Sequence, residues 1–134
     1  MEMIFNTIEE IEKYYDEKSN TYVFKENGEY IGLVTFNFDL EVNASIEAYN
    51  IKSKNIKAHD IKAHDINVHD INVHNINAHD INGHIIIACD VKANSIDVKD
   101  VIAWEIYINN NIKAKYIVAN SQITCKSITT NWRY

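Results

Sequence analysis

The sequence predicts an all-β protein whose main part is a β-solenoid, and three observations lead to this interpretation. A five-residue repeat runs from residue 46 to about residue 130. Its first position is Ile or Val in thirteen consecutive pentads, and its third position is small or β-branched. Apolar residues therefore recur at spacings of two and three in alternation, which fits neither the 3.6-residue period of a helix nor the two-residue period of a plain strand.

The alternating spacing is typical of short strands separated by corners. Positions one and three of each pentad would point inward, position two outward, and positions four and five would turn the chain. Successive coils would then pair their backbones about 4.8 Å apart, as in any sheet. Because one pentad buries only an isoleucine and a small residue, we expect stability to come from contacts between neighbouring coils.

Several pentads resemble those of the pentapeptide-repeat family, in which an Asp or Asn precedes a large apolar residue. The dipeptides that carry the resemblance are Asp60–Ile61, Asp65–Ile66, Asp70–Ile71 and Asn75–Ile76. The resemblance covers about residues 46–130 and implies a right-handed, four-sided β-helix with four pentads in each coil. The chain departs from the family two residues before the large apolar residue, where the family has a small inward residue and this chain has His59, His64, His69, His74, His79 and His84.

This departure leaves two registers to compare. In the family's register the six histidines point inward, whereas in the other register Ile and Ala or Val fill the interior and the histidines lie at corners. Burying six imidazoles without partners would cost several kcal/mol in total, so we favour the second register. The number of sides stays open, because fifteen-residue triangular coils are possible beside twenty-residue square ones.

The first third of the chain predicts a short helix and a hairpin that cap the solenoid, which divides the chain into residues 1–45 and 46–134. Thr7 and Glu10 form a capping-box pattern that predicts a helix over residues 5–19. Its expected apolar face consists of Ile4, Ile8, Ile11 and Tyr15. The Asn27–Gly28 pair predicts a hairpin between strands at residues 21–25 and 30–38. A cap is needed because solenoids require closed ends to remain soluble.

At the other end of the chain, Trp132 and Tyr134 are expected on a terminal coil that no cap sequence follows. Such a coil offers unpaired backbone and apolar surface. These features predict an end-to-end homodimer through these two aromatic residues.

The charge is distributed unevenly and bears on the partner. The net charge is −6, and residues 1–45 hold three lysines against ten acidic residues, whereas the rest of the chain is near neutral. This pattern argues against direct nucleic-acid binding, which normally needs a basic patch. The expected partner is a basic, nucleic-acid-handling protein, bound by acidic residues of the predicted helix and by one acidic ladder of the solenoid: Glu9, Glu10, Glu12, Asp16 and Glu17, with Asp60, Asp80 and Asp100.

The histidines are the candidate metal ligands. In twenty-residue coils His59 stacks on His79 and His64 on His84, and such pairs could share a Zn²⁺ or Ni²⁺ ion with nearby aspartates. The favoured alternative is that these pentads are recent near-copies in which His is a tolerated corner residue, so no cofactor is expected.

Catalysis has little support in this sequence. Every His–Asp pair has the same local context, whereas an active site uses one irregular constellation. The three glycines are too far apart for a phosphate-binding loop. We therefore expect a protein that is not an enzyme.

The expected function is that of a non-enzymatic binding protein, most simply a small inhibitor of a nucleic-acid-handling protein. The resemblance implies a DNA mimic, because the family includes acidic rods that imitate duplex DNA, and small size with one acidic pole is also typical of phage counter-defence proteins such as anti-CRISPRs. The alternative is a structural, self-assembling solenoid module. Two cysteines and the absence of a long apolar run predict a cytoplasmic protein without a membrane segment.

Overall fold

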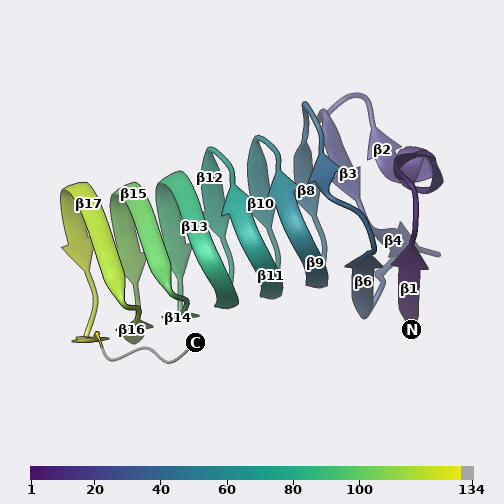
Figure 1. Ribbon diagram of the computed structural model, residues 1–134. Coiled ribbons are helices and arrows are strands. Elements are labelled where there is room, and N and C mark those ends of the chain that lie inside the picture. Colours follow the sequence, from purple (N-terminus) through teal and green to yellow (C-terminus); the bar gives the residue numbers. More distant parts are fainter. Residues whose placement is uncertain (131–134) are drawn as a thin grey trace.

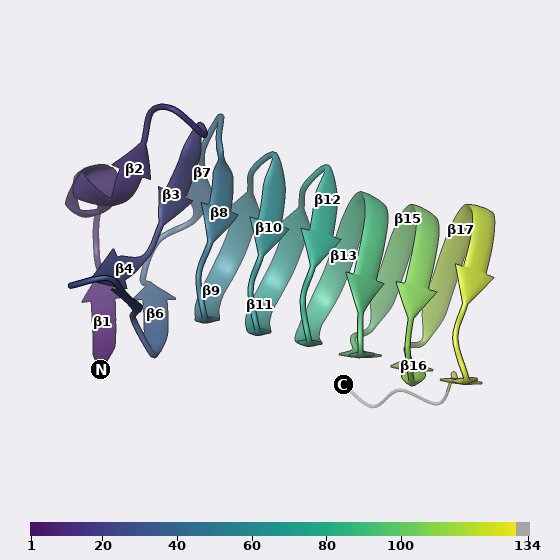
Figure 2. The same cartoon turned by 180° about the vertical axis from the view of Figure 1, so that it is seen from behind.

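The computed structural model describes residues 1–130 and confirms an all-β protein built as a β-solenoid of about six turns. Sixteen strands join in one continuous sheet that winds around the core, and two more form a separate hairpin. The coils follow one another along an axis, with the N-terminal segment at one end (Figures 1 and 2). No helix among the described residues is long and apolar enough to span a bilayer.

Each coil contains fifteen residues, so the coil is three-sided rather than four-sided. Ile61 pairs with Ile46 and Ile76, and Ile66 pairs with Ile51 and Ile81, always in parallel. The twenty-residue coil that the family resemblance implies is therefore wrong for this chain. Beyond residue 95 the offset grows to sixteen, as in the pairing of Ile96 with Ile112, because the asparagine run at residues 109–111 adds one residue. A further irregularity makes it seventeen where Ile106 pairs with Ile123.

The repeating part of the solenoid contains eleven strands, which alternate between short strands on one side and longer ones that bend around a corner. They are β8 (Ser45–Glu47), β9 (Asn50–Lys57), β10 (Asp60–Lys62), β11 (Asp65–Asn72), β12 (Asn75–Asn77), β13 (Asp80–Ala93), β14 (Ser95–Asp97), β15 (Asp100–Ile108), β16 (Asn111–Lys113), β17 (Tyr116–Thr124) and β18 (Ser127–Thr129).

The predicted register is confirmed. First-position residues from Ile46 to Ile112 are at most 2% exposed, and the small third-position residues are buried or half-buried behind them. The six histidines lie at the corners with exposed or half-exposed side chains. No polar or charged residue among residues 1–130 is buried, which agrees with the cost of burying imidazoles without partners.

The first third of the chain contributes seven strands and one short helix. They are β1 (Glu2–Phe5), the 3₁₀ helix η1 (Ile8–Tyr14), β2 (Tyr15–Asp16), β3 (Thr21–Val23), β4 (Lys25–Glu26), β5 (Glu29–Tyr30), β6 (Leu33–Phe36) and β7 (Leu40–Glu41). Strand β3 pairs with β8, while β6 and β7 pair with successive parts of β9. The ladders thus cross the expected boundary at residue 45, and residues 21–41 already form one three-sided layer.

The helix predicted over residues 5–19 is wrong in length and in type. Residues 2–5 instead extend the sheet, because β1 pairs with β6. Only seven residues remain helical, and the Thr7 side chain makes no capping hydrogen bond to the backbone. Ile11 and Tyr14 are the buried pair, three residues apart as a 3₁₀ helix of three residues per turn requires, whereas Ile4, Ile8 and Tyr15 of the predicted face are exposed.

The predicted turn is confirmed, but the strands expected at residues 21–25 and 30–38 do not pair with each other beyond two residues, because β3 pairs with β2 and β8 and β6 pairs with β1 and β9. Strands β4 and β5 pair antiparallel around Asn27 and Gly28, whose φ angles are 54° and 81°. Two successive positive φ angles define the type I′ turn that an Asn–Gly pair favours.

The two ends of the solenoid differ in how well their inward side chains are covered. At the N-terminal end a cluster of aromatic rings, including Phe5, Tyr14 and Phe24, packs on Phe36 with centroid distances between 5.2 and 5.9 Å. At the other end, Ile123 and Ile128 occupy inward positions of the last described coil but are 38% and 45% exposed.

Candidate functional site: the corner columns, the third face and the acidic segment

Three corner columns run along the solenoid, each formed by position four of successive coils. The columns follow from the fifteen-residue ladder and from coil-to-coil hydrogen bonds, in which the corner N–H donates to the corner carbonyl one coil earlier. Column one contains His59, His74, Cys89 and Trp104; column two contains Tyr49, His64, His79 and Asn94; column three contains Lys54, His69, His84 and Lys99.

The histidine pairs therefore differ from those predicted. His79 lies over His64 rather than His59, with ring centroids 4.8 Å apart and an interplanar angle of 2°. His84 lies over His69 rather than His64, at 4.7 Å and 11°. The expected pairs assumed twenty-residue coils, and the fifteen-residue coil moves every partner by one pentad.

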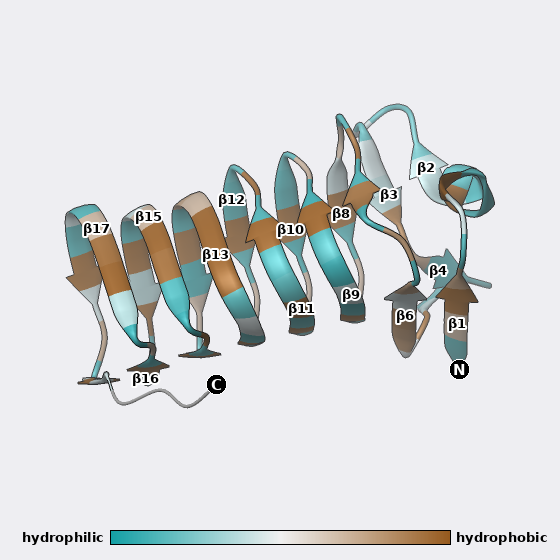
Figure 3. Ribbon diagram, in the orientation of Figure 1, coloured by the Kyte–Doolittle hydropathy of each residue, from teal (hydrophilic) through white to brown (hydrophobic). Residues whose placement is uncertain are grey.

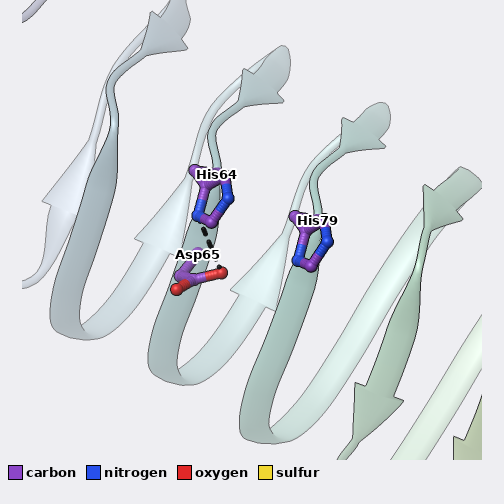
Figure 4. A group of neighbouring side chains, drawn as sticks. All are labelled: His64, Asp65 and His79. Atoms are coloured by element: carbon purple, nitrogen blue, oxygen red, sulfur yellow. Dashed lines mark ion pairs between the residues drawn. The ribbon is translucent and has the colours of Figure 1, made fainter.

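Two of these columns bring an aspartate next to a histidine pair. His64, Asp65 and His79 form one group, and His69, Asp70 and His84 form another, with one potential ligand atom of each residue within 4.8 Å of the other two. Figure 4 shows the first group, in which the two imidazole rings lie parallel on neighbouring coils and Asp65 faces His64. The Nδ1 atom of His64 lies 3.2 Å from Oδ1 of Asp65.

The acidic ladder predicted from Asp60, Asp80 and Asp100 does not form. In the three-sided coil Asp60 pairs with Asn75, and Asp80 pairs with Asp65 and Ser95. Asp100 pairs with Ile85 and Tyr116. The three aspartates therefore lie in three different rows and do not make one stripe.

The acidic residues of the N-terminal segment lie together on its surface. Glu9, Glu10, Glu12, Asp16 and Glu17 are all exposed, on η1 and on the turn that follows. Asp16 also has a structural role, because its carboxylate accepts hydrogen bonds from the Lys18 N–H at 3.1 Å and from the Ser19 hydroxyl at 3.0 Å.

Nearby, Glu26 links η1 to the hairpin. It accepts a hydrogen bond from the Tyr14 hydroxyl and lies 3.2 Å from the Lys13 ammonium. The Tyr14 hydrogen bond, followed by the contact with Lys13, holds the pKa of the Glu26 carboxyl below its ordinary value.

The sequence reasoning missed an apolar stripe on one side of the solenoid. We call this side the third face; its inward row contains Ile56, Ile71, Ile86 and Val101. Its outward row begins with Lys57 and Asn72 and continues with Ile87, Ile102 and Val118. These last three side chains, the apolar stripe, are 41%, 45% and 50% exposed. Figure 3 shows the hydrophobic colour over β13, β15 and β17, where β9 and β11 have a broad hydrophilic band.

Two features extend the apolar stripe. Trp104, which is 56% exposed, occupies the corner that follows the third face. Towards the N-terminal segment, a shallow hollow lies beside the stripe and is lined by Leu40, Asp70, Ile85 and Ile87, among others. The signal in the sequence is a change at position two, which holds Lys or Asn from residue 52 to residue 82 and then Ile87.

Both cysteines are free thiols, with Cys89 exposed in column one and Cys125 half-buried. The predicted dimerisation residues Trp132 and Tyr134 lie outside the described residues. The fold thus defines a three-sided β-solenoid with two His–Asp–His groups and an exposed apolar stripe. Comparison with protein-family models, with curated proteins and with solved structures finds no match to this chain.

Proposed function

We propose that the protein is a non-enzymatic binding protein that attaches to another protein through the third face of its solenoid. The apolar stripe is the observation that carries this proposal. Outward positions of a solenoid are normally polar, and a contiguous row of large apolar side chains on a water-exposed face is typical of an interaction site. A rigid sheet also loses little conformational freedom on binding, which favours affinity.

The proposed partner is a basic, nucleic-acid-handling protein that the chain inhibits by occupying its basic surface. Support comes from the exposed acidic residues of the N-terminal segment and from the charge of −7 carried by residues 1–45. Charges at the edge of an interface accelerate encounter and select the partner. Among such inhibitors, a DNA mimic now has less support, because the aspartate ladder is not formed; a counter-defence inhibitor such as an anti-CRISPR does not need that ladder.

The test uses two variants that separate the two contributions. The stripe variant carries Ile87→Ser, Ile102→Ser and Val118→Ser, and its control carries Asn67→Ser and Asn82→Ser on another face. The charge variant carries Glu9→Lys, Glu12→Lys and Glu17→Lys, and leaves Asp16 unchanged because that residue holds a turn. The partner is captured from the native host with wild-type protein, identified by mass spectrometry and purified for binding kinetics at two salt concentrations.

We expect the stripe variant to dissociate about 10- to 100-fold faster, since central apolar contacts hold most of the binding energy. The charge variant should associate more slowly and lose most of its salt dependence. The asparagine control should bind as wild type does. Wild-type kinetics in both test variants would refute the proposal, provided circular dichroism shows that they are folded.

The exposed side of the last described coil favours a second candidate function, that of a self-assembling structural module. Ile123 and Ile128 are inward residues left exposed on the last described coil, and β17 and β18 each pair with only one strand. A second copy stacked on this end would cover both features. A molecular mass that rises with protein concentration, and that falls to the monomer in Ile123→Lys, would support this function over the first.

A further inference from the structure

We propose that the solenoid binds two divalent transition-metal ions of the Zn²⁺ class, one in each His–Asp–His group. The proposal is independent of the proposed function. The first site consists of His64, Asp65 and His79, and the second of His69, Asp70 and His84.

The donor set matches this class of metal. Zn²⁺ binds imidazole nitrogens and carboxylate oxygens at about 2.0–2.2 Å, and ligand atoms around a tetrahedral ion lie about 3.3 Å apart. In the first site Nδ1 of His64 and Oδ1 of Asp65 already lie 3.2 Å apart. The His79 imidazole, which is 52% exposed, has a potential ligand atom within 4.8 Å of those of His64 and Asp65. Solvent exposure leaves room for water to complete the coordination shell.

The second site is the more compact of the two. Oδ1 of Asp70 lies 3.1 Å from Nδ1 of His69 and 3.8 Å from Nδ1 of His84, so one carboxylate oxygen reaches both rings. In the first site a second carboxylate is within reach instead, because Oδ2 of Asp80 lies 3.2 Å from Nδ1 of His79. Each site therefore offers two imidazoles from successive coils and at least one carboxylate between them.

The carboxylates are also oriented for a ligand. Oδ1 of Asp65 and Oδ1 of Asp70 are shielded from solvent and accept no hydrogen bond within the protein. Other position-five side chains, such as Asn55 and Asp100, have similarly placed oxygens, but the two site aspartates differ in lying beside a pair of stacked histidines. Each of these oxygens instead has an imidazole Nδ1 close by, that of His64 at 3.2 Å and that of His69 at 3.1 Å. Because a shielded anionic oxygen is costly unless its charge is compensated, a cation held between carboxylate and imidazole would lower that cost.

Column one contains a third pair of histidines, which lacks the free carboxylate that a metal site needs. His59 and His74 also occupy successive coils, but the neighbouring Asp60 accepts a hydrogen bond from the Asn75 N–H at 3.2 Å. Its carboxylate is thus engaged with the backbone, and these residues form no compact group of three potential ligands. The chain therefore contains a matched control for its own proposed sites.

The test is calorimetric titration of tag-free protein with ZnCl₂, in a Cys89→Ser, Cys125→Ser background so that thiolates contribute nothing. We expect about two ions per chain, and a melting temperature that rises with zinc and returns to its starting value with a chelator. His79→Gln and His84→Gln should each remove one ion, and the double variant should remove both. His74→Gln should leave the count at two.

Because the three changed histidines lie at exposed or half-exposed corners, the variants should fold, and circular dichroism verifies this. Absence of zinc binding in the parent protein would overturn the proposal. An unchanged count in the His79→Gln, His84→Gln double variant, or a lower count in His74→Gln, would show instead that zinc binds the histidines without regard to these groups.

Discussion

Two adjacent isoleucines on β13 provide the sharpest test of which pentad positions face the core. Ile86 occupies position one of its pentad and is 0% exposed, with Ile71 and Val101 beside it in the ladder. Ile87 occupies position two and is 41% exposed. The same substitution, Ile to Ala, therefore removes the same atoms from opposite sides of one strand.

Ile86→Ala should destabilise the protein by about 3–4 kcal/mol. Truncating a buried isoleucine to alanine costs about 2–5 kcal/mol, since it combines lost burial with a cavity. The upper half of that range is expected because the cavity weakens contacts to the coils on both sides, and a solenoid is held together by contacts between neighbours. A loss of this size would lower the melting temperature by about 10 °C for a chain of this length.

Ile87→Ala should cost less than about 1 kcal/mol, because a half-exposed side chain loses little burial and the remaining effect is the strand preference for a β-branched residue. The assay is urea unfolding followed by circular dichroism, with midpoints and slopes compared among wild type and the two variants. An equal loss in both variants, or a larger loss in Ile87→Ala, would refute the register. Retained stability in Ile87→Ala would also show that the apolar stripe is not needed for folding.

Two further predictions concern backbone packing and pH. Gly83→Ala should destabilise the protein more than Gly28→Ala, because a Cβ at Gly83 would overlap the Val68 carbonyl oxygen, whereas Gly28 has open space and only its φ of 81° to oppose the change; equal midpoints in urea would contradict this. The hydrogen bond that Tyr30 donates to Glu47 raises the Tyr30 pKa to about 12. Since the folded state holds this proton more tightly, the stabilisation is complete below the ordinary value of 10 and is lost as the pH rises towards 12. Melting temperatures between pH 9 and pH 12 should therefore fall less steeply in Tyr30→Phe, and an identical fall would contradict the assignment.

The register of the pentads was predictable because the cost of burying imidazoles without partners decides which residues face the core. Placing His64 or His69 inside would bury a polar ring without a partner, while Ile66 and Ile71 would gain nothing outside. The Asn27–Gly28 hairpin was predictable for a similar reason, since few dipeptides accept two successive positive φ angles. Local chemistry decides both features.

The number of residues in a coil was not predictable, because a period of five divides fifteen and twenty equally well. Near-identical pentads add to the difficulty: with six histidines in consecutive pentads, either coil places His64 over another histidine. The helix was overestimated for a different reason. At the start of the predicted helix Phe5 pairs with Phe36, and towards its end Tyr15 and Asp16 pair with Tyr22 and Thr21. These pairings between strands override the local helical pattern at both ends.

One residue, Asp70, belongs both to a proposed metal site and to the surface beside the proposed protein interface. Asp70 is the carboxylate that lies between His69 and His84, and it also lines the hollow beside Ile87 on the third face. A cation bound there would place positive charge at the edge of the proposed interface, whereas the group around His64 lies one corner away. In an array of near-copies, specific chemistry arises where one copy differs from the next or where stacking brings copies together. The apolar stripe is an instance of the first, because position two changes from Asn72 to Ile87, and the histidine groups are an instance of the second.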